Sequence, residues 1–186
     1  MTNALRLPAR DALIEAAFEV LGRDPSASLA LVAEKAGVGR ATLHRHFPTR
    51  DALMHALAKT AIAETDAACE EACENVQSAA QALELSLRAL IPLGPRYGFL
   101  TREPVEYDPE ISAEYDRQGE ELRQLIEEAK REGALDTRCP TAWLLEAYDH
   151  LIFAGWEITR SGEATPKQAA DLAWRTFTTG VGGQTP

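Results

Sequence analysis

Apolar residues recur every three to four positions along nearly the whole chain, which is the spacing of one face of an α-helix. Leu13, Ala17, Phe18 and Leu21 show this spacing first, and Gly22 follows them as a helix stop signal. No convincing run alternates apolar and polar residues as a half-buried β-strand does. The pattern therefore predicts an all-α protein with about nine helices.

Proline and glycine residues divide this helical pattern. Short helices are expected over residues 29–36 and 40–47, because Gly37 and Pro48 interrupt the pattern there. A longer helix follows Pro48. Residues 92–109 contain four prolines and are expected to hold only a short helix within irregular connections. The remaining helices are expected over residues 77–91, 109–132, 140–161 and 166–179.

The composition agrees with a globular protein. The chain has 186 residues, of which 45% are hydrophobic and 26% charged, so it is long enough to bury a core. No apolar run approaches the roughly 18 residues that span a membrane, and the first residues are too polar for a signal peptide. Three cysteines at uneven spacing are no disulfide framework. We expect a cytoplasmic protein with no membrane partner.

Charge is unevenly distributed along the chain. Residues 1–50 carry seven basic and five acidic side chains, whereas residues 51–186 carry twelve basic and twenty-four acidic ones. The first segment is therefore net basic, in a protein whose net charge is −10. A basic end on an acidic protein favours contact of that end with a polyanion.

Residues 28–53 have the pattern of two short helices joined by a glycine-containing turn, which is a helix-turn-helix. Leu43 and Phe47 are four residues apart, so both are expected to point into the core. The opposite side of this second helix is rich in donors and small groups. There, arginine can pair with guanine, and a threonine methyl can contact thymine in the major groove. The residues expected on this outer side are Arg40, Ala41, Thr42, His44 and Arg45.

Several short segments near the N-terminus match one known pattern. They are Val-Ala-Glu-Lys-Ala-Gly-Val at 32–38, Ala-Thr-Leu at 41–43, His-Phe-Pro-Thr-Arg at 46–50, and Leu53. Through these positions, residues 10–60 resemble the DNA-binding domain of the tetracycline-repressor (TetR) family of transcription regulators. The total length and the all-α remainder also fit this family.

The resemblance implies contacts to DNA phosphates in addition to contacts to bases. It places Ser28 against a phosphate through its hydroxyl and the free N–H groups of the helix start, and it places Arg50 against another. Two positions depart from the family pattern, because His44 stands where tyrosine is usual and Gly39 replaces the usual serine or threonine cap. The expected DNA-binding residues are Ser28, Arg40, Ala41, Thr42, His44, Arg45 and Arg50.

The resemblance divides the chain into a helix-turn-helix DNA-binding domain, residues 1–50, and a helical effector-binding and dimerisation domain, residues 51–186. Aromatic residues gather late in the second part. Such side chains can line ligand pockets between helices, although most helix-spaced aromatics belong to a core. Few basic residues could hold a strong anion, so we expect a small, mainly apolar effector of unknown identity. The residues expected to bind it are Tyr97, Phe99, Arg102, Trp143 and Tyr148.

Apolar faces with small residues recur in the last two expected helices. They favour a homodimer formed through residues about 140–180, in which two helix pairs make an intermolecular four-helix bundle. The alternative is that both faces pack only on the rest of their own chain. A two-fold dimer would place two recognition helices about one DNA turn apart on a palindromic operator.

Other chemistry finds little support in the sequence. Cys69 and Cys73 share one helix face and are expected to be core or subunit contacts rather than a redox or metal sensor. His44 and His46 are two residues apart, on different sides of a helix, and are no metal-ligand pair. Because the chain also has no phosphate-binding glycine loop and no nucleophile elbow, we expect neither an enzyme nor a metal or cofactor.

These observations favour a homodimeric transcription regulator, and a repressor in particular, which a small effector releases from a palindromic operator. Two alternatives stay open. One is a helical small-molecule-binding protein whose helix-turn-helix is only structural. The other is an activator of the same fold.

Overall fold

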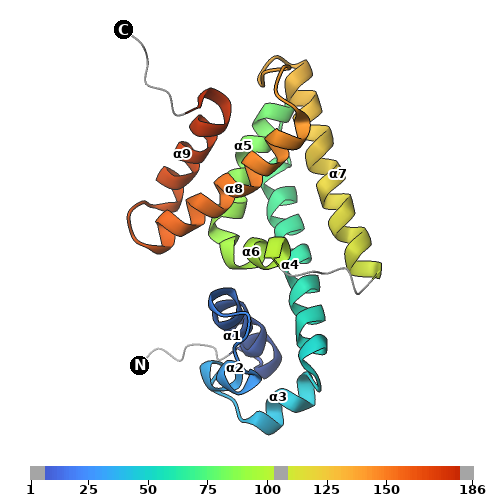
Figure 1. Ribbon diagram of the computed structural model, residues 1–186, viewed down its shortest axis with the longest axis vertical. Helices are drawn as coiled ribbons and strands as arrows, with labels where there is room; N and C mark the ends of the chain where they lie inside the picture. The colour runs from blue at the N-terminus through green and yellow to red at the C-terminus, as the bar shows by residue number, and fades with distance from the viewer. Residues whose placement is uncertain (1–6, 103–108, 181–186) are drawn as a thin grey trace.

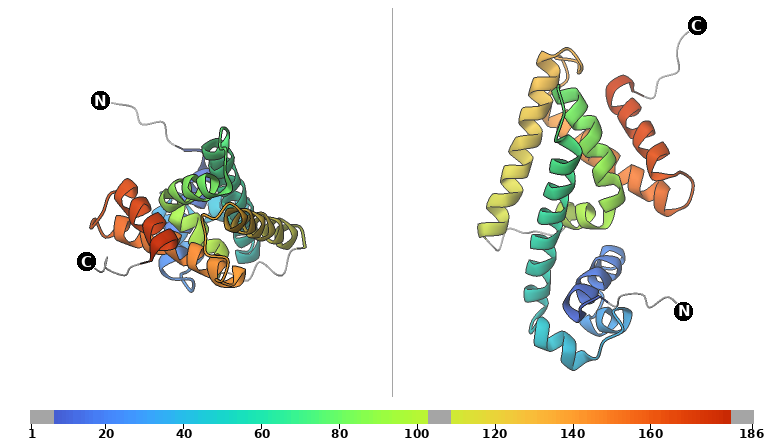
Figure 2. Two further views of the ribbon diagram at one scale, coloured as in Figure 1. Left: turned by 90° about the horizontal axis from the view of Figure 1, so that it is seen from above. Right: turned by 180° about the vertical axis from the view of Figure 1, so that it is seen from behind.

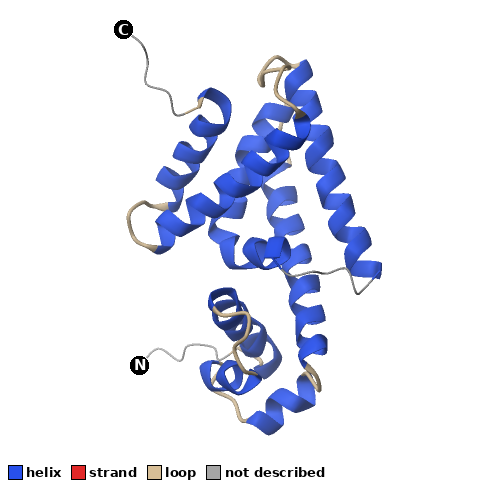
Figure 3. Ribbon diagram, viewed as in Figure 1, coloured by secondary structure: helices blue, strands red, loops and turns tan. Residues whose placement is uncertain are grey.

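The computed structural model describes residues 7–102 and 109–180, and this part of the chain contains helices and loops but no strand (Figure 3). Nine α-helices and one short 3-10 helix, η1, occur in these residues, which confirms the all-α expectation. The elements are α1 (Ala9–Arg23), α2 (Leu29–Lys35), α3 (Arg40–His46), α4 (Arg50–Cys73), α5 (Ala79–Leu90), η1 (Ile91–Leu93), α6 (Gly94–Arg102), α7 (Pro109–Arg131), α8 (Thr141–Arg160) and α9 (Pro166–Thr179).

Helix α4 joins the two parts of the molecule (Figure 1). Its first turns belong to a unit with α1, α2 and α3, and its later turns pack against α5 and α7 in a larger body that also holds α8 and α9. Helix α6 lies between the two parts and contacts α1, α4 and α8 (Figure 2). Among the described residues, the contacts between the N-terminal unit and the body are made mainly by α4 and α6, and Ile111 of α7 adds to the N-terminal core.

Side-chain caps fix the helix starts that the sequence predicts. The Ser28 hydroxyl accepts a hydrogen bond from the Leu31 N–H at 3.3 Å, and the Thr49 hydroxyl accepts one from the Ala52 N–H at 3.0 Å. Gly37 ends α2 with a φ of 67°, a left-handed conformation that glycine adopts without steric cost. The turn between α2 and α3 is thereby held in the shape of a helix-turn-helix.

Two apolar clusters hold the chain together. The cluster of the N-terminal unit extends along α4 as far as Ile62, and it takes in Phe99 of α6 and Ile111 of α7. The other cluster joins α5, α7, α8 and α9. The N-terminal core thus uses side chains from well beyond residue 50, the boundary predicted for the first domain.

Close packing attaches α6 firmly to α8. A Cβ atom on Gly94 would lie 1.9 Å from Cγ of Trp156, and one on Gly155 would lie 2.6 Å from Cδ1 of Ile91. Both distances are far shorter than any real carbon contact, so only glycine permits this approach of η1 and α6 to α8. In its described residues the proline-rich segment holds two short helices, η1 and α6, which follow α5 directly, whereas the sequence predicts one short helix within irregular connections.

Candidate DNA-binding surface and effector cavity

Helix α3 presents one apolar and one polar side. Leu43 and the following Phe47 are 1% and 3% exposed and anchor the helix in the N-terminal core, as the sequence predicts. Gly39 caps the helix without a side-chain hydrogen bond. The outer side carries the residues predicted to contact bases: Arg40, Ala41, His44 and Arg45 are exposed, and Thr42 is half-buried.

The two residues predicted to contact phosphates have different surroundings. Ser28 is exposed at the start of α2, where its hydroxyl already caps the helix. The Arg50 guanidinium donates to the carbonyl of Ala27 at 2.8 Å and also to the carbonyl of Pro25. In this structure Arg50 therefore fastens the start of α4 to the connection before α2, and its phosphate contact stays a prediction.

A charged and aromatic junction links the N-terminal unit to the body. The Arg96 guanidinium of α6 donates to Glu64 of α4 at 2.7 Å and to Glu15 of α1, and it lies 4.7 Å from the centre of the Phe18 ring. The Phe99 ring meets the same Phe18 ring edge to face at 5.7 Å. One helix of the body thus holds α1 and α4 at the same time.

A cavity of about 200 Å³ lies between α4, α5, α7 and α8 in the body. Its walls combine aromatic and aliphatic side chains with carboxylates and uncharged polar groups, and no lysine or arginine lines it. The lining residues are Thr65, Asp66, Cys69, Leu83, Ser86, Leu90, Tyr115, Gln118, Gly119, Glu121, Leu122, Leu125, Tyr148 and Asp149.

Of the residues predicted to bind an effector, the structure brings Tyr148 to this cavity. Tyr148 is 1% exposed, and its hydroxyl donates to the Leu83 carbonyl at 2.6 Å. Phe99 packs instead in the N-terminal core, and Trp143 is 67% exposed on the surface of α8. The side chains of Tyr97 and Arg102 lie outside the described residues, so the structure does not place them.

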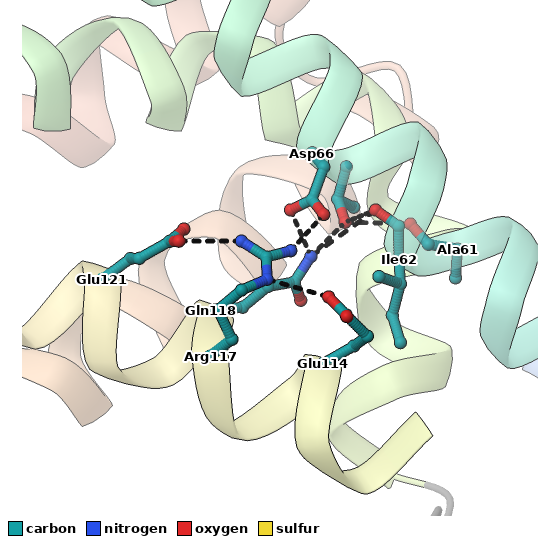
Figure 4. A network of polar contacts seen from close by, with 8 residues as sticks. Ala61, Ile62, Asp66, Glu114, Arg117, Gln118 and Glu121 are labelled. Carbon is teal, nitrogen blue, oxygen red and sulfur yellow. Dashed lines mark hydrogen bonds and ion pairs between the residues drawn. The ribbon is translucent and has the colours of Figure 1, made fainter. Parts of the chain in front are cut away.

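The carboxylates give the cavity a negative wall. Asp66 of α4 accepts hydrogen bonds from Gln118 at 2.7 Å and from Arg117, both on α7 (Figure 4). Burial, followed by the charges of Asp149, Glu146 and Asp116, raises the pKa of Tyr115. The sequence alone did not reveal these residues, because only the packing of α4 against α7 brings them together.

Two cysteines lie at or beside the cavity. Cys69 is part of its wall, and the Cys73 sulfur lies 3.4 Å from the Ser86 hydroxyl oxygen. Burial raises the pKa of Cys69 to about 11, so the group remains a thiol at neutral pH and is a poor nucleophile. Both cysteines are half-buried packing groups, which agrees with a core role.

A larger groove of about 800 Å³ lies between α1 of the N-terminal unit and α8 of the body. Its charged side chains pair with one another, for example Lys35 with Glu19 at 2.8 Å and Arg160 with Glu157 at 2.6 Å. The groove thus carries charges of both signs, several of which are paired across its own walls.

An exposed recognition helix at one end and a cavity within a helical body define a class of protein: helix-turn-helix regulators with an attached ligand-binding body. Residues 13–57 match the model of the family described as bacterial regulatory proteins, tetR family. The chain is also 32% identical over 174 residues to the HTH-type transcriptional repressor LfrR of Mycolicibacterium smegmatis, a match that covers 92% of this chain and 89% of LfrR. The chain belongs to the tetR family of bacterial transcription regulators, as its sequence predicts.

Solved structures agree with this assignment. The crystal structure of LfrR from Mycobacterium smegmatis in complex with proflavine matches with a TM-score of 0.75 and 31% identity, over 94% of this chain and 97% of LfrR. The MbdR regulator from Azoarcus sp. CIB matches with a TM-score of 0.72 at 18% identity, over 95% and 100% of the two chains, and shows the shared fold alone. Within the described residues, no helix is both long and apolar enough to cross a membrane.

Proposed function

We propose that this regulator binds a palindromic operator as a homodimer, and that a planar aromatic cation releases it by entering the cavity between α4, α5, α7 and α8. The observation that carries this proposal is the cavity wall. It presents two tyrosines, Tyr115 and Tyr148, together with the carboxylates of Asp66, Glu121 and Asp149, and no basic side chain. Aromatic rings and carboxylates together favour a flat cation.

The similarity to LfrR supports the same ligand class. LfrR was crystallised with proflavine, which is a planar three-ring aromatic cation at neutral pH. The effector predicted from the sequence is mainly apolar, and an aromatic cation keeps that apolar surface while adding one positive charge. The positive charge is expected because the carboxylates of the cavity wall attract a cation.

On the DNA side, residues 1–50 form the proposed DNA-binding domain and residues 51–186 the effector-binding and dimerisation domain. Arg40, Ala41, Thr42, His44 and Arg45 would contact base edges or nearby phosphates in the major groove. Ser28 and Arg50 would contact phosphates of the backbone, for which Arg50 would exchange its carbonyl partners for a phosphate oxygen.

Release follows from the size and position of the cavity. At about 200 Å³ it is smaller than the roughly 300–1,000 Å³ of most ligand pockets, so a three-ring ligand must move its walls apart. One wall is α4. Its Glu64 accepts a hydrogen bond from Arg96 of α6, and its Asp66 lines the cavity. A state with a wider cavity and a displaced N-terminal unit would bind the effector better, and operator DNA would weaken effector binding to the same extent.

The charge of Asp66 tests the effector site. We expect Asp66→Asn to weaken proflavine binding roughly tenfold, because a negative charge beside a partly desolvated cation is lost. Glu71→Gln, an exposed change on the same helix, is expected to leave the affinity within about twofold. Dye fluorescence on DNA-free protein measures both affinities.

Operator release needs a control for intercalation, since proflavine also binds DNA. With a fluorescently labelled operator, the Asp66→Asn variant should need roughly tenfold more dye for release than the unchanged protein. Equal release of both proteins would show that the dye acts on the DNA, and equal dye affinity of both proteins would refute the cavity as the effector site.

The dimer is proposed to form through α8 and α9, residues about 140–180. The structure buries part of the predicted apolar faces within the chain, including Leu144 and Ala173. It leaves Trp143 and Leu172 exposed at 67% and 42%, with Ala154 exposed on the same side of α8 as Trp143. Exposed large apolar groups, together with a small residue on the same side of α8 as Trp143, favour a helix–helix contact with a second copy.

A charge placed on this face tests the dimer. We expect Ala154→Arg to convert the protein to monomers at micromolar concentration and to weaken operator binding at least tenfold, since a monomer engages only one half-site. Sedimentation measures the change. Ala142→Arg, also exposed on α8 but on another side of the helix, should remain dimeric. A dimeric Ala154→Arg variant would exclude this interface.

A further inference from the structure

One arginine beside the cavity is surrounded by three carboxylates (Figure 4). The Arg117 guanidinium of α7 donates to Glu114 at 2.8 Å, to Glu121 at 2.8 Å, and to Asp66 of α4. These hydrogen bonds, first the one to Glu114 and then the one to Glu121, raise the pKa of Arg117, which is therefore fully charged. One positive charge thus serves three negative ones.

Two of these carboxylates are the cavity wall itself. Asp66 and Glu121 both line the cavity, whereas Arg117 does not. The Asp66 oxygens are shared between two donors of α7, because Arg117 contacts Oδ2 and the Gln118 amide contacts Oδ1 at 2.7 Å. The guanidinium therefore lies behind the acidic wall and neutralises part of the charge that an effector would meet.

The ion pairs of Arg117 contribute little to stability. The Arg117 side chain is 39% exposed and that of Asp66 is 29% exposed, so water screens their attraction. Ion pairs in such exposed positions stabilise a fold only slightly. The neighbouring Gln118 also joins α7 to α4, through Asp66 and through the Thr65 hydroxyl at 3.2 Å. An arginine is thus not needed here to hold the two helices together.

We infer that Arg117 is a specificity-determining residue, a built-in cation that competes with cationic effectors for Asp66 and Glu121. This inference rests on the proposed aromatic cation in the cavity. With Arg117 in place, the wall retains enough negative charge to select a cation but binds it weakly. An incoming cation draws Asp66 and Glu121 inward and away from the guanidinium.

Three variants separate the charge of Arg117 from its other properties. Arg117→Gln removes the charge, and Arg117→Lys keeps the charge but loses the planar fork. Arg123→Gln is the matched control: Arg123 lies on the same helix, contacts the exposed Glu120 at 3.6 Å and does not line the cavity. All three change surface side chains, and circular dichroism checks that each variant is folded.

Fluorescence titration with two aromatic probes measures the effect. Proflavine is the cationic probe and N-phenyl-1-naphthylamine the neutral one. Removal of a unit charge a few ångströms from the ligand is expected to tighten proflavine binding roughly tenfold in Arg117→Gln. Arg117→Lys and Arg123→Gln should stay within about twofold of the unchanged protein, and the neutral probe should bind all four proteins alike.

The outcomes test the inference about Arg117 separately from the proposed effector site. Tighter proflavine binding by Arg117→Gln alone supports the competing cation, and so does binding that appears only when Arg117 is removed. Unchanged or weaker binding by Arg117→Gln, or equal tightening by Arg117→Lys, overturns the inference while leaving the cavity as the effector site. If no protein binds proflavine, the proposed function and the inference both fail.

Discussion

Replacing Arg40 and Arg45 together by alanine is expected to abolish recognition of the operator. Both side chains are exposed on α3, whose opposite face is buried, so they are free to reach base edges. A good arginine contact to guanine discriminates by about 1–3 kcal/mol, so the pair supplies roughly 100-fold or more. Fluorescence anisotropy on DNA from upstream of the gene, with a scrambled duplex as reference, measures the loss.

The control for this experiment is Arg23→Ala. Arg23 is exposed in the same N-terminal segment, but it lies at the end of α1 in the groove that faces α8. Its removal should weaken binding to both duplexes slightly and equally, and this effect should fade as salt is raised. If the double variant kept its preference for the operator, Arg40 and Arg45 would not carry recognition. If neither the unchanged protein nor the double variant preferred the operator, the helix-turn-helix would be only structural.

Replacing Phe99 by alanine is expected to lower the free energy of unfolding by about 3–5 kcal/mol. Phe99 is 5% exposed and packs edge to face on Phe18, so its loss leaves a cavity where α6 meets α1. For a chain of this size, the midpoint of thermal unfolding should fall by roughly 6–20 °C. Proflavine affinity below the transition should stay within about twofold, because Phe99 does not line the cavity.

Phe99→Leu is the conservative variant for comparison with Phe99→Ala. Leucine retains most of the buried apolar surface, so this variant should lose only about 1–1.5 kcal/mol. The sequence predicts that Phe99 binds the effector, whereas the structure shows it in the N-terminal core. The two roles predict opposite effects of Phe99→Ala on stability and on proflavine binding. A stable Phe99→Ala protein with weak proflavine binding would return Phe99 to the effector site.

The DNA-binding end could be predicted from the sequence because its signals are local. Ser28, Gly37 and Thr49 act on the turns beside them, and Leu43 and Phe47 show the buried side of α3 by their spacing alone. The residue pattern over this short stretch therefore specifies helix ends, the turn and the exposed face together. Arg50 was less predictable, since its carbonyl partners lie more than twenty residues earlier in the chain.

The cavity could not be predicted in the same way. Asp66 and Gln118 are 52 positions apart, and neither is unusual on its own helix. Glu121 follows Glu120 in an acidic helix, and only the contact with Arg117 and the neighbouring cavity distinguishes it. Aromatic content was a poor guide for a similar reason: Tyr148 and Trp143 lie on one helix, but one is buried at the cavity and the other is on the surface.

The composition of the N-terminal core determines when this regulator can fold during its synthesis. A chain leaves the ribosome from its N-terminus, and domains generally fold as they emerge. Here α1 to α4 cannot complete their core until Phe99 and Ile111 have been synthesised. The nascent chain therefore gains a fully packed DNA-binding unit only after α4 and α5, two walls of the cavity, have been synthesised. A truncated product ending before α6 would lack the packing needed to hold an operator.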